Sequence, residues 1–198
     1  MAHEISHGMM ADYLGDSTAK VMGRLSLNPI KHIDPLGSII VPGLLILFNA
    51  GLVIGWAKPV PINPANFKDK RYGEAKVSIA GPAANIIIAL FFGLLLRLLI
   101  GFNLESVFVS NLYLFFQIIV WVNLLLAIFN LMPVPPLDGS HILFAFLSDR
   151  FERIKIFMKR NSLFLLLIFI MFLFNLVIPI VSLLFRTITG TPGLGVFY

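Results

Sequence analysis

Several segments of this chain are apolar over the length that a helix needs to cross a lipid bilayer. A hydrocarbon core about 30 Å thick requires roughly 20 consecutive apolar residues. Residues 163–185 and 112–132 meet that length without a charge, and residues 77–101 carry one charge, Arg97, near their end. With 58% hydrophobic and only 13% charged residues, the composition is also that of a membrane protein. These three segments therefore predict membrane-spanning helices.

A fourth apolar segment, residues 36–56, is long enough to cross but is interrupted. It contains Pro-Gly at 42–43 and Asn-Ala-Gly at 49–51, which disturb helical hydrogen bonding at membrane depth. This segment predicts a broken span or a re-entrant hairpin. Since no repeat or long linker appears, we predict one integral-membrane domain over residues 1–198. Its fold class is an all-α polytopic membrane protein with about four to six membrane segments, including the possible re-entrant hairpin.

The basic residues favour the hairpin, because short cytoplasmic loops are enriched in Lys and Arg. If residues 36–56 dip in and return, thirteen of the fifteen Lys and Arg lie on the cytoplasmic side. If this segment crosses fully, Lys20, Arg24 and Lys31 move to the outer face and the asymmetry weakens. The net charge of +5 is thus explained by the enrichment of Lys and Arg in the cytoplasmic loops. Attraction to anionic membrane lipid is a secondary effect, and no nucleic-acid partner is implied.

The amino terminus carries an H-E-x-x-H pattern formed by His3, Glu4 and His7. Residues four apart lie on one face of a helix, so both imidazoles can bind one zinc ion while Glu4 acts on a water beside it. The chain has no cysteine, so a metal must use His, Asp or Glu. The alternative is a polar helix start whose histidines cap the helix or face solvent. Only two residues precede His3, so we expect that the upstream part of a membrane helix is missing.

A catalytic zinc ion takes three protein ligands, which leaves one to find. Asp138 is the candidate, because it follows a proline-rich stretch at 133–136 that holds an extended backbone before a helix predicted at 141–147. Its alternative role is the N-cap of that helix, and the H-E-x-x-H pattern favours the ligand role. Asp12 and Asp16 are nearer in sequence, but Gly15 predicts a helix end where both carboxylates cap or face solvent.

Taken together, these motifs resemble the site-2 protease family of intramembrane metalloproteases, especially compact bacterial members without PDZ or CBS domains. Besides the H-E-x-x-H pattern, residues 80–85 are similar to its small-Gly-x-x-x-Asn motif and residues 130–139 to its Asn-Pro-rich-Leu-Asp-Gly motif. The resemblance implies that zinc is bound by three ligands inside the helix bundle and that three further residues take part in the reaction. The zinc ligands would be His3, His7 and Asp138. Glu4 would be the catalytic carboxylate, and Asn85 and Asn130 would lie near the substrate or the developing oxyanion.

Both asparagines also have structural alternatives. Asn85 lies among small residues and could bond between helices, and Asn130 could brace the proline break that follows it. His141 is expected at an interface or against the ligand residues. Residues 31–35, which include His32, are interpreted as a turn with solvated polar groups rather than a second metal site. The proline-rich stretch 59–64 predicts extended backbone, either a rigid connector or, as in the family, a segment that pairs with unwound substrate.

The function implied by the resemblance is hydrolysis of peptide bonds in transmembrane substrate helices, in regulated intramembrane proteolysis at the bacterial cytoplasmic membrane. Its partners would be a transmembrane protein or peptide substrate and membrane lipid, and the sequence assigns no oligomeric state. Two alternatives stay open. A metal transporter would use the histidines and Asp138 but leaves Glu4 without a role. A non-catalytic relative that binds transmembrane helices would need neither Glu4 nor zinc.

Overall fold

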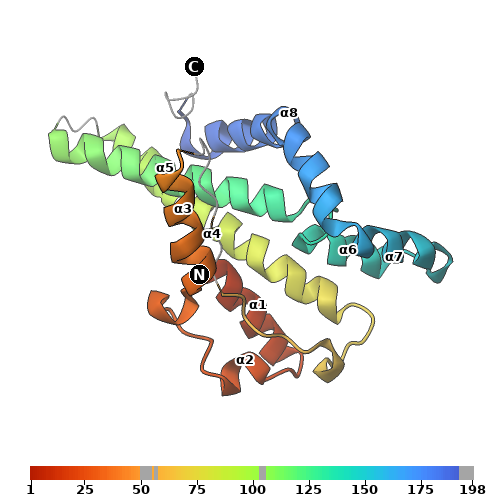
Figure 1. Ribbon diagram of the computed structural model, residues 1–198. Coiled ribbons are helices and arrows are strands. Elements are labelled where there is room, and N and C mark those ends of the chain that lie inside the picture. Colours follow the sequence, from red (N-terminus) through yellow and green to blue (C-terminus); the bar gives the residue numbers. More distant parts are fainter. Residues whose placement is uncertain (50–54, 56–57, 103–105, 192–198) are drawn as a thin grey trace. The chain divides into compact units, whose positions relative to one another are not determined.

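The computed structural model describes residues 1–49, 55, 58–102 and 106–191, and within them every regular element is helical (Figure 1). The prediction of an all-α fold is confirmed. The chain divides into two compact units, Met1–Gly73 and Glu74–Tyr198. The expectation of one domain over residues 1–198 stays a prediction.

The first unit is built from short helices. Its longest element, α1, ends where Gly15 takes φ +110°, a left-handed conformation that favours glycine, so the stop predicted from the sequence is present. Its elements are α1 (Ala2–Tyr13), α2 (Thr18–Val21), η1 (Pro29–His32), η2 (Pro35–Ile40), α3 (Val41–Leu47) and η3 (Pro64–Asn66).

An apolar helical run of η2 followed by α3 covers Pro35–Leu47, which is shorter than a membrane span. Asp34 starts it, because its Oδ1 accepts hydrogen bonds of 2.9 Å from the backbone N–H groups of Leu36 and Gly37. This run corresponds to the first arm of the predicted hairpin. Most of the expected return arm, residues 50–54 and 56–57, lies outside the described residues, so the choice between hairpin and full crossing stays a prediction.

The second unit holds the long apolar helices. Two of them, α4 and α5, are long and apolar enough to cross a membrane, and α8 is a third if its two halves, bent by 61°, count as one span. Pro179 lies in the second half and has no N–H, so the carbonyl of Asn175, the first residue of that half, lacks its usual helical partner. The elements are α4 (Gly73–Gly101), α5 (Val107–Asn130), α6 (Asp138–Phe146), η4 (Asp149–Phe151), α7 (Glu152–Arg160) and α8 (Ser162–Thr189).

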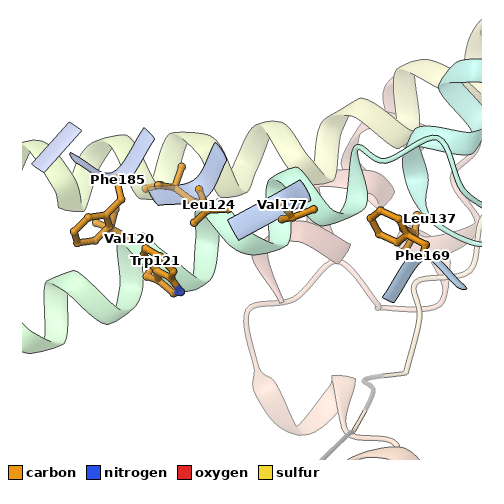
Figure 2. Packing of buried hydrophobic residues seen from close by; sticks show 9 residues of the cluster. Val120, Trp121, Leu124, Leu137, Phe169, Val177 and Phe185 are labelled. Carbon is orange, nitrogen blue, oxygen red and sulfur yellow. The ribbon is translucent and has the colours of Figure 1, made fainter. Parts of the chain in front are cut away.

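The three spans predicted from the sequence thus correspond to α4, α5 and α8. The core of this unit lies chiefly where α5 packs along α8 (Figure 2). Trp121 and Phe185 meet edge to face with ring centroids 5.5 Å apart. Close packing extends to α4, since a Cβ added at Gly93 would lie 2.4 Å from Ile188 Cγ2.

Candidate metal centre

The H-E-x-x-H residues lie on α1, as the sequence predicts. The Nε2 atoms of His3 and His7 are 3.0 Å apart, and their ring centroids are separated by 4.6 Å with an interplanar angle of 88°. His7 is buried at 7% exposure, whereas His3 and Glu4 are half-buried. The two histidines therefore face each other and do not both turn to solvent.

This spacing fits two imidazole ligands of one zinc ion. Two nitrogens bound at about 2.0–2.1 Å in tetrahedral geometry are roughly 3.3 Å apart, a few tenths of an ångström from the observed separation. A small opening of the pair, within the reach of ordinary side-chain rotation, would bring both nitrogens to ligand distance. The donor set is also one that zinc prefers.

The helix that carries these residues is packed tightly at the position next to His7. A Cβ added at Gly8 would lie 2.5 Å from Leu25 Cδ2 and 2.9 Å from Val60 Cγ1. Val60 belongs to the proline-rich stretch 59–64 and is 6% exposed. This stretch therefore runs against the helix that carries the candidate ligands, and only glycine allows so close an approach.

Asp16 fixes the carboxyl-terminal end of the same helix. The expectation of local capping is met, because its Oδ1 accepts a hydrogen bond from the Thr18 backbone N–H at the start of α2, but the alternative that it faces solvent is wrong. Asp16 is fully buried. Its Oδ2 accepts a hydrogen bond of 2.6 Å from the Asn63 backbone N–H, and its Oδ1 accepts one of 2.9 Å from the Asn66 side chain. Thr18 donates to Oδ1 as well, through its backbone N–H and its hydroxyl. The partners at 63 and 66 are remote in sequence, which is why local turn chemistry did not predict them.

The hydrogen bonds around Asp16 determine its charge state. Burial by itself raises the pKa of this carboxyl, because it penalises the charged form. The hydrogen bonds donated by Thr18, Asn63 and Asn66 stabilise the carboxylate more strongly, so the pKa of Asp16 lies below its usual range. Asp16 is thus a charged anchor for two segments.

Asp138, the predicted third ligand, is the first residue of α6 in the second unit and is half-buried. Leu137 occupies the N-cap position, so Asp138 is not the cap and the helix begins three residues earlier than predicted. The position of Asp138 depends on Gly139, where an added Cβ would lie 2.2 Å from the carbonyl oxygen of Leu131 and 2.4 Å from that of Met132. The backbone beside Asp138 therefore rests directly on the end of α5.

Both candidate asparagines also lie in the second unit. Asn130 is the last residue of α5, and its Nδ2 donates a 2.9 Å hydrogen bond to the Leu126 carbonyl one turn earlier. Asn85 lies in α4 and is 3% exposed, three residues after Pro82. Because Pro82 has no N–H, the carbonyl four residues before it loses its helical partner. The roles of Asn85 and Asn130 stay predictions.

Two further histidines take positions that the sequence did not reveal. His141 Nδ1 lies 3.1 Å from Oε2 of Glu74, a residue not singled out by any motif because it is 67 positions away. His32 is 3% exposed and its Nε2 lies 2.7 Å from the Ser26 carbonyl oxygen. The prediction of solvated polar groups at residues 31–35 is therefore wrong for His32, which packs inside the turn.

Comparison with known proteins assigns a family. A model of peptidase family M50 matches residues 99–176, which include α5, α6 and the loop before Asp138. Over 143 residues the chain is 46% identical to the YwhC protein of Bacillus subtilis (strain 168), covering 71% of this chain and 62% of that protein. The chain belongs to peptidase family M50, the site-2 protease family. The resemblance drawn from its motifs is confirmed.

A more distant relative is also similar to this chain. The Rip2 protein of Mycolicibacterium smegmatis (strain ATCC 700084 / mc(2)155) is 31% identical over 153 residues, covering 76% of this chain and 55% of that protein. The names of YwhC and Rip2 both assign them provisionally to the zinc metalloproteases. The chain spans about 55–62% of the length of these two relatives. No solved structure matches the chain. Membership of family M50, together with α4 and α5, makes the chain an integral membrane protein.

Proposed function

We propose that this chain is a zinc metalloprotease that hydrolyses peptide bonds of transmembrane substrate helices. His3, His7 and Asp138 would hold the zinc ion, and Glu4 would be the catalytic carboxylate. The observation that supports this proposal most directly is the 3.0 Å separation of the two Nε2 atoms on α1, beside Glu4, in a chain of family M50. Asp138 is included because its carboxylate would supply the third protein ligand that a catalytic zinc ion needs.

The chain's own residues would divide the reaction between them. Zinc, when bound, lowers the pKa of a water molecule and polarises a carbonyl group. Glu4, one position from His3 on the same helix, would take the proton of the attacking water and deliver it to the leaving amine. Asn85 and Asn130 would donate side-chain hydrogen bonds to the substrate backbone or to the developing oxyanion, where a preorganised amide is most effective in a water-poor cavity.

The substrate class follows from the membrane setting. A helical substrate hides its carbonyl groups in its own hydrogen bonds, so it must unwind before hydrolysis. The extended stretch 59–64, which packs against α1 through Val60, would then lie close enough to contact the unwound strand. In this proposal both units form one membrane domain over residues 1–198 in the bacterial cytoplasmic membrane, and its role is regulated intramembrane proteolysis.

Zinc content tests the proposed ligand set without a known substrate. Metal analysis of the detergent-purified full chain should give close to one zinc per chain, and Asp138→Ala should lose most of it. Glu152→Ala is the matched control, because it also removes one carboxylate and its side chain is 59% exposed on α7. A well-folded parent chain without zinc, or Asp138→Ala with full zinc, would contradict the proposed site and favour a non-catalytic helix-binding protein.

A further inference from the structure

The short helix α7 has an apolar face that the described residues of the chain leave open. Phe151, Ile154, Phe157 and Met158 are spaced three and four residues apart, so they lie on one side of the helix. The first three are 44%, 49% and 59% exposed. Exposed aromatic and branched side chains on one helix face indicate an interaction surface rather than a solvated helix.

Basic residues, together with the exposed Ile156, occupy the remaining sides of this helix. Residues 149–160 contain five Lys or Arg and two acidic residues, and one of these, Glu152, has its Oε2 3.7 Å from Lys155 Nζ. Arg153 and Arg160 are exposed. An apolar face bordered by Lys and Arg is typical of a helix that lies in the plane of an anionic membrane surface, where the basic side chains reach the headgroups.

The chain connection indicates which surface covers α7. Only Asn161 separates its last residue, Arg160, from the start of α8, whose apolar sequence begins at Leu163 (Figure 1). The corner is held by a 2.8 Å hydrogen bond from Asn161 Nδ2 to the Phe157 carbonyl. If the apolar sequence of α8 enters the hydrocarbon core from Leu163 onward, α7 lies at the depth of the lipid headgroups.

A cavity beside α7 offers a place for one headgroup. It has a volume of about 220 Å³ and lies between α6 and the corner of α7 and α8. Its lining combines the Lys159 amine and the Ser162 hydroxyl with the ring of Phe144, whose centroid is 5.4 Å from Lys159 Nζ. The ammonium and hydroxyl groups can bind the phosphate of a phospholipid headgroup, and the aromatic ring can contact its glycerol and acyl chains.

We propose that α7 is an in-plane membrane anchor that binds anionic phospholipid. Ile154 and Phe157 insert between the lipids, and Lys159 and Arg160 contact headgroup phosphates, one of which occupies the cavity at Lys159. This surface belongs to the second unit and includes none of the proposed zinc ligands. Its failure would leave the proposed protease function unchanged.

Depth in the membrane is the first quantity to measure. The chain has no cysteine, so one introduced thiol can carry a polarity-sensitive fluorophore at a single site. Full-length Ile154→Cys and Glu152→Cys chains would be labelled and reconstituted in vesicles of phosphatidylglycerol and phosphatidylcholine. The label at 154 should emit at shorter wavelength and be quenched by brominated acyl chains, and the label at 152 should not. Equal emission and quenching at both sites would refute insertion of the apolar face.

Lipid preference is the second quantity. In mixed vesicles, brominated phosphatidylglycerol should quench the label at 154 several-fold more than brominated phosphatidylcholine, since each cation near an anionic surface contributes up to roughly a fivefold preference. Adding Lys159→Gln and Arg160→Gln should remove most of this preference. The matched control combines Lys58→Gln with Lys68→Gln, which removes the same charge from exposed side chains of the first unit. This control should retain the preference for phosphatidylglycerol.

Two outcomes separate the lipid from other sources of phosphate. Inorganic phosphate and glycerol phosphate at millimolar concentration should leave the quenching ratio unchanged, because neither carries acyl chains. Competition by these soluble anions would show a phosphate site without lipid anchoring and would overturn the proposal. Equal quenching by the two brominated lipids, or an equal loss of preference in the Lys58 and Lys68 control, would overturn it as well.

Discussion

The carboxylate of Asp16 accepts a 2.6 Å hydrogen bond from the backbone N–H of Asn63, and this bond joins two segments 47 residues apart in sequence. One segment is the end of α1, the helix of His3, Glu4 and His7. The other is the proline-rich stretch 59–64. A second long-range bond, from the Lys68 backbone N–H to the Leu14 carbonyl at 2.8 Å, joins the same regions. The candidate ligand helix is therefore fixed at its carboxyl end to the extended stretch beside it.

Replacing Asp16 should destabilise the first unit. In Asp16→Ala the Asn63 N–H and the Asn66 amide lose a buried carboxylate acceptor, and a hydrogen bond to a charged group contributes about 1.5–3 kcal/mol. Thermal unfolding in detergent micelles should show a clear drop of the midpoint. Asp12→Ala is the matched control on the same helix end, because Asp12 pairs with Lys20 at the surface, where water screens the pair and its loss should shift the midpoint little. Equal shifts in the two variants would contradict the anchoring role.

The same anchor predicts a dependence of stability on pH. The pKa of Asp16 is lowered in the folded chain, so folding favours the carboxylate. Its stabilisation is complete above the unfolded-state pKa of about 3.9 and is lost as the pH falls through the lower folded-state pKa. The difference in unfolding midpoint between the parent chain and Asp16→Asn should therefore be constant from pH 7 to pH 5 and shrink below pH 4. A difference in unfolding midpoint that grows below pH 4 would contradict a lowered pKa of Asp16 in the folded chain.

Features set by local sequence could be predicted for this chain. The spans at α4 and α5 follow from apolar length, and the stop at Gly15 follows from the need for a positive φ. The spacing in His3-Glu4-Ile5-Ser6-His7 predicts that two imidazoles share one helix face, and the Nε2 separation confirms that part. These predictions need only a few neighbouring residues.

Features set by distant partners could not be predicted. The burial of Asp16 depends on Asn63 and Asn66, and the contact of His141 depends on Glu74; neither pairing leaves a local pattern. The bend of α8 was missed for a different reason. Pro179 is visible in the sequence, but apolar length alone gave it no weight, and its missing N–H leaves a carbonyl one turn earlier without its usual helical partner.

Glu4→Gln separates the proposed chemistry from its alternatives. The amide keeps the size of the side chain but cannot accept a proton, so hydrolysis of a transmembrane test substrate should fall by roughly 10²–10⁴-fold. Zinc content should stay at the parental level, because Glu4 is not a proposed ligand. Glu152→Gln, the same carboxylate-to-amide change at a side chain that is 59% exposed on α7, is the matched control and should keep parental hydrolysis. Unchanged hydrolysis in Glu4→Gln would exclude Glu4 as the proton acceptor.

The contact between His141 and Glu74 should contribute little to stability. Both side chains are substantially exposed, at 41% and 50%, and exposed ion pairs contribute about 0–1 kcal/mol. A double-mutant cycle with His141→Ala and Glu74→Ala, followed by thermal unfolding, should give a coupling energy within that range. Zinc content should be unaffected in both single variants. Loss of zinc in His141→Ala would instead assign this histidine to the metal site.

Gly139→Ala tests whether close backbone packing positions Asp138. The added Cβ would lie 2.2 Å from the Leu131 carbonyl oxygen, a distance that backbone atoms cannot accept, so either the start of α6 or the end of α5 must move. Since Asp138 is the residue before it, zinc content should fall with stability. Gly43→Ala is the matched control, because nothing lies within 4 Å of a Cβ added there inside α3. That change should be neutral or slightly stabilising, by at most about 1 kcal/mol. Full zinc and parental stability in Gly139→Ala would show that the loop tolerates a shift and that the ligand is not held by this contact.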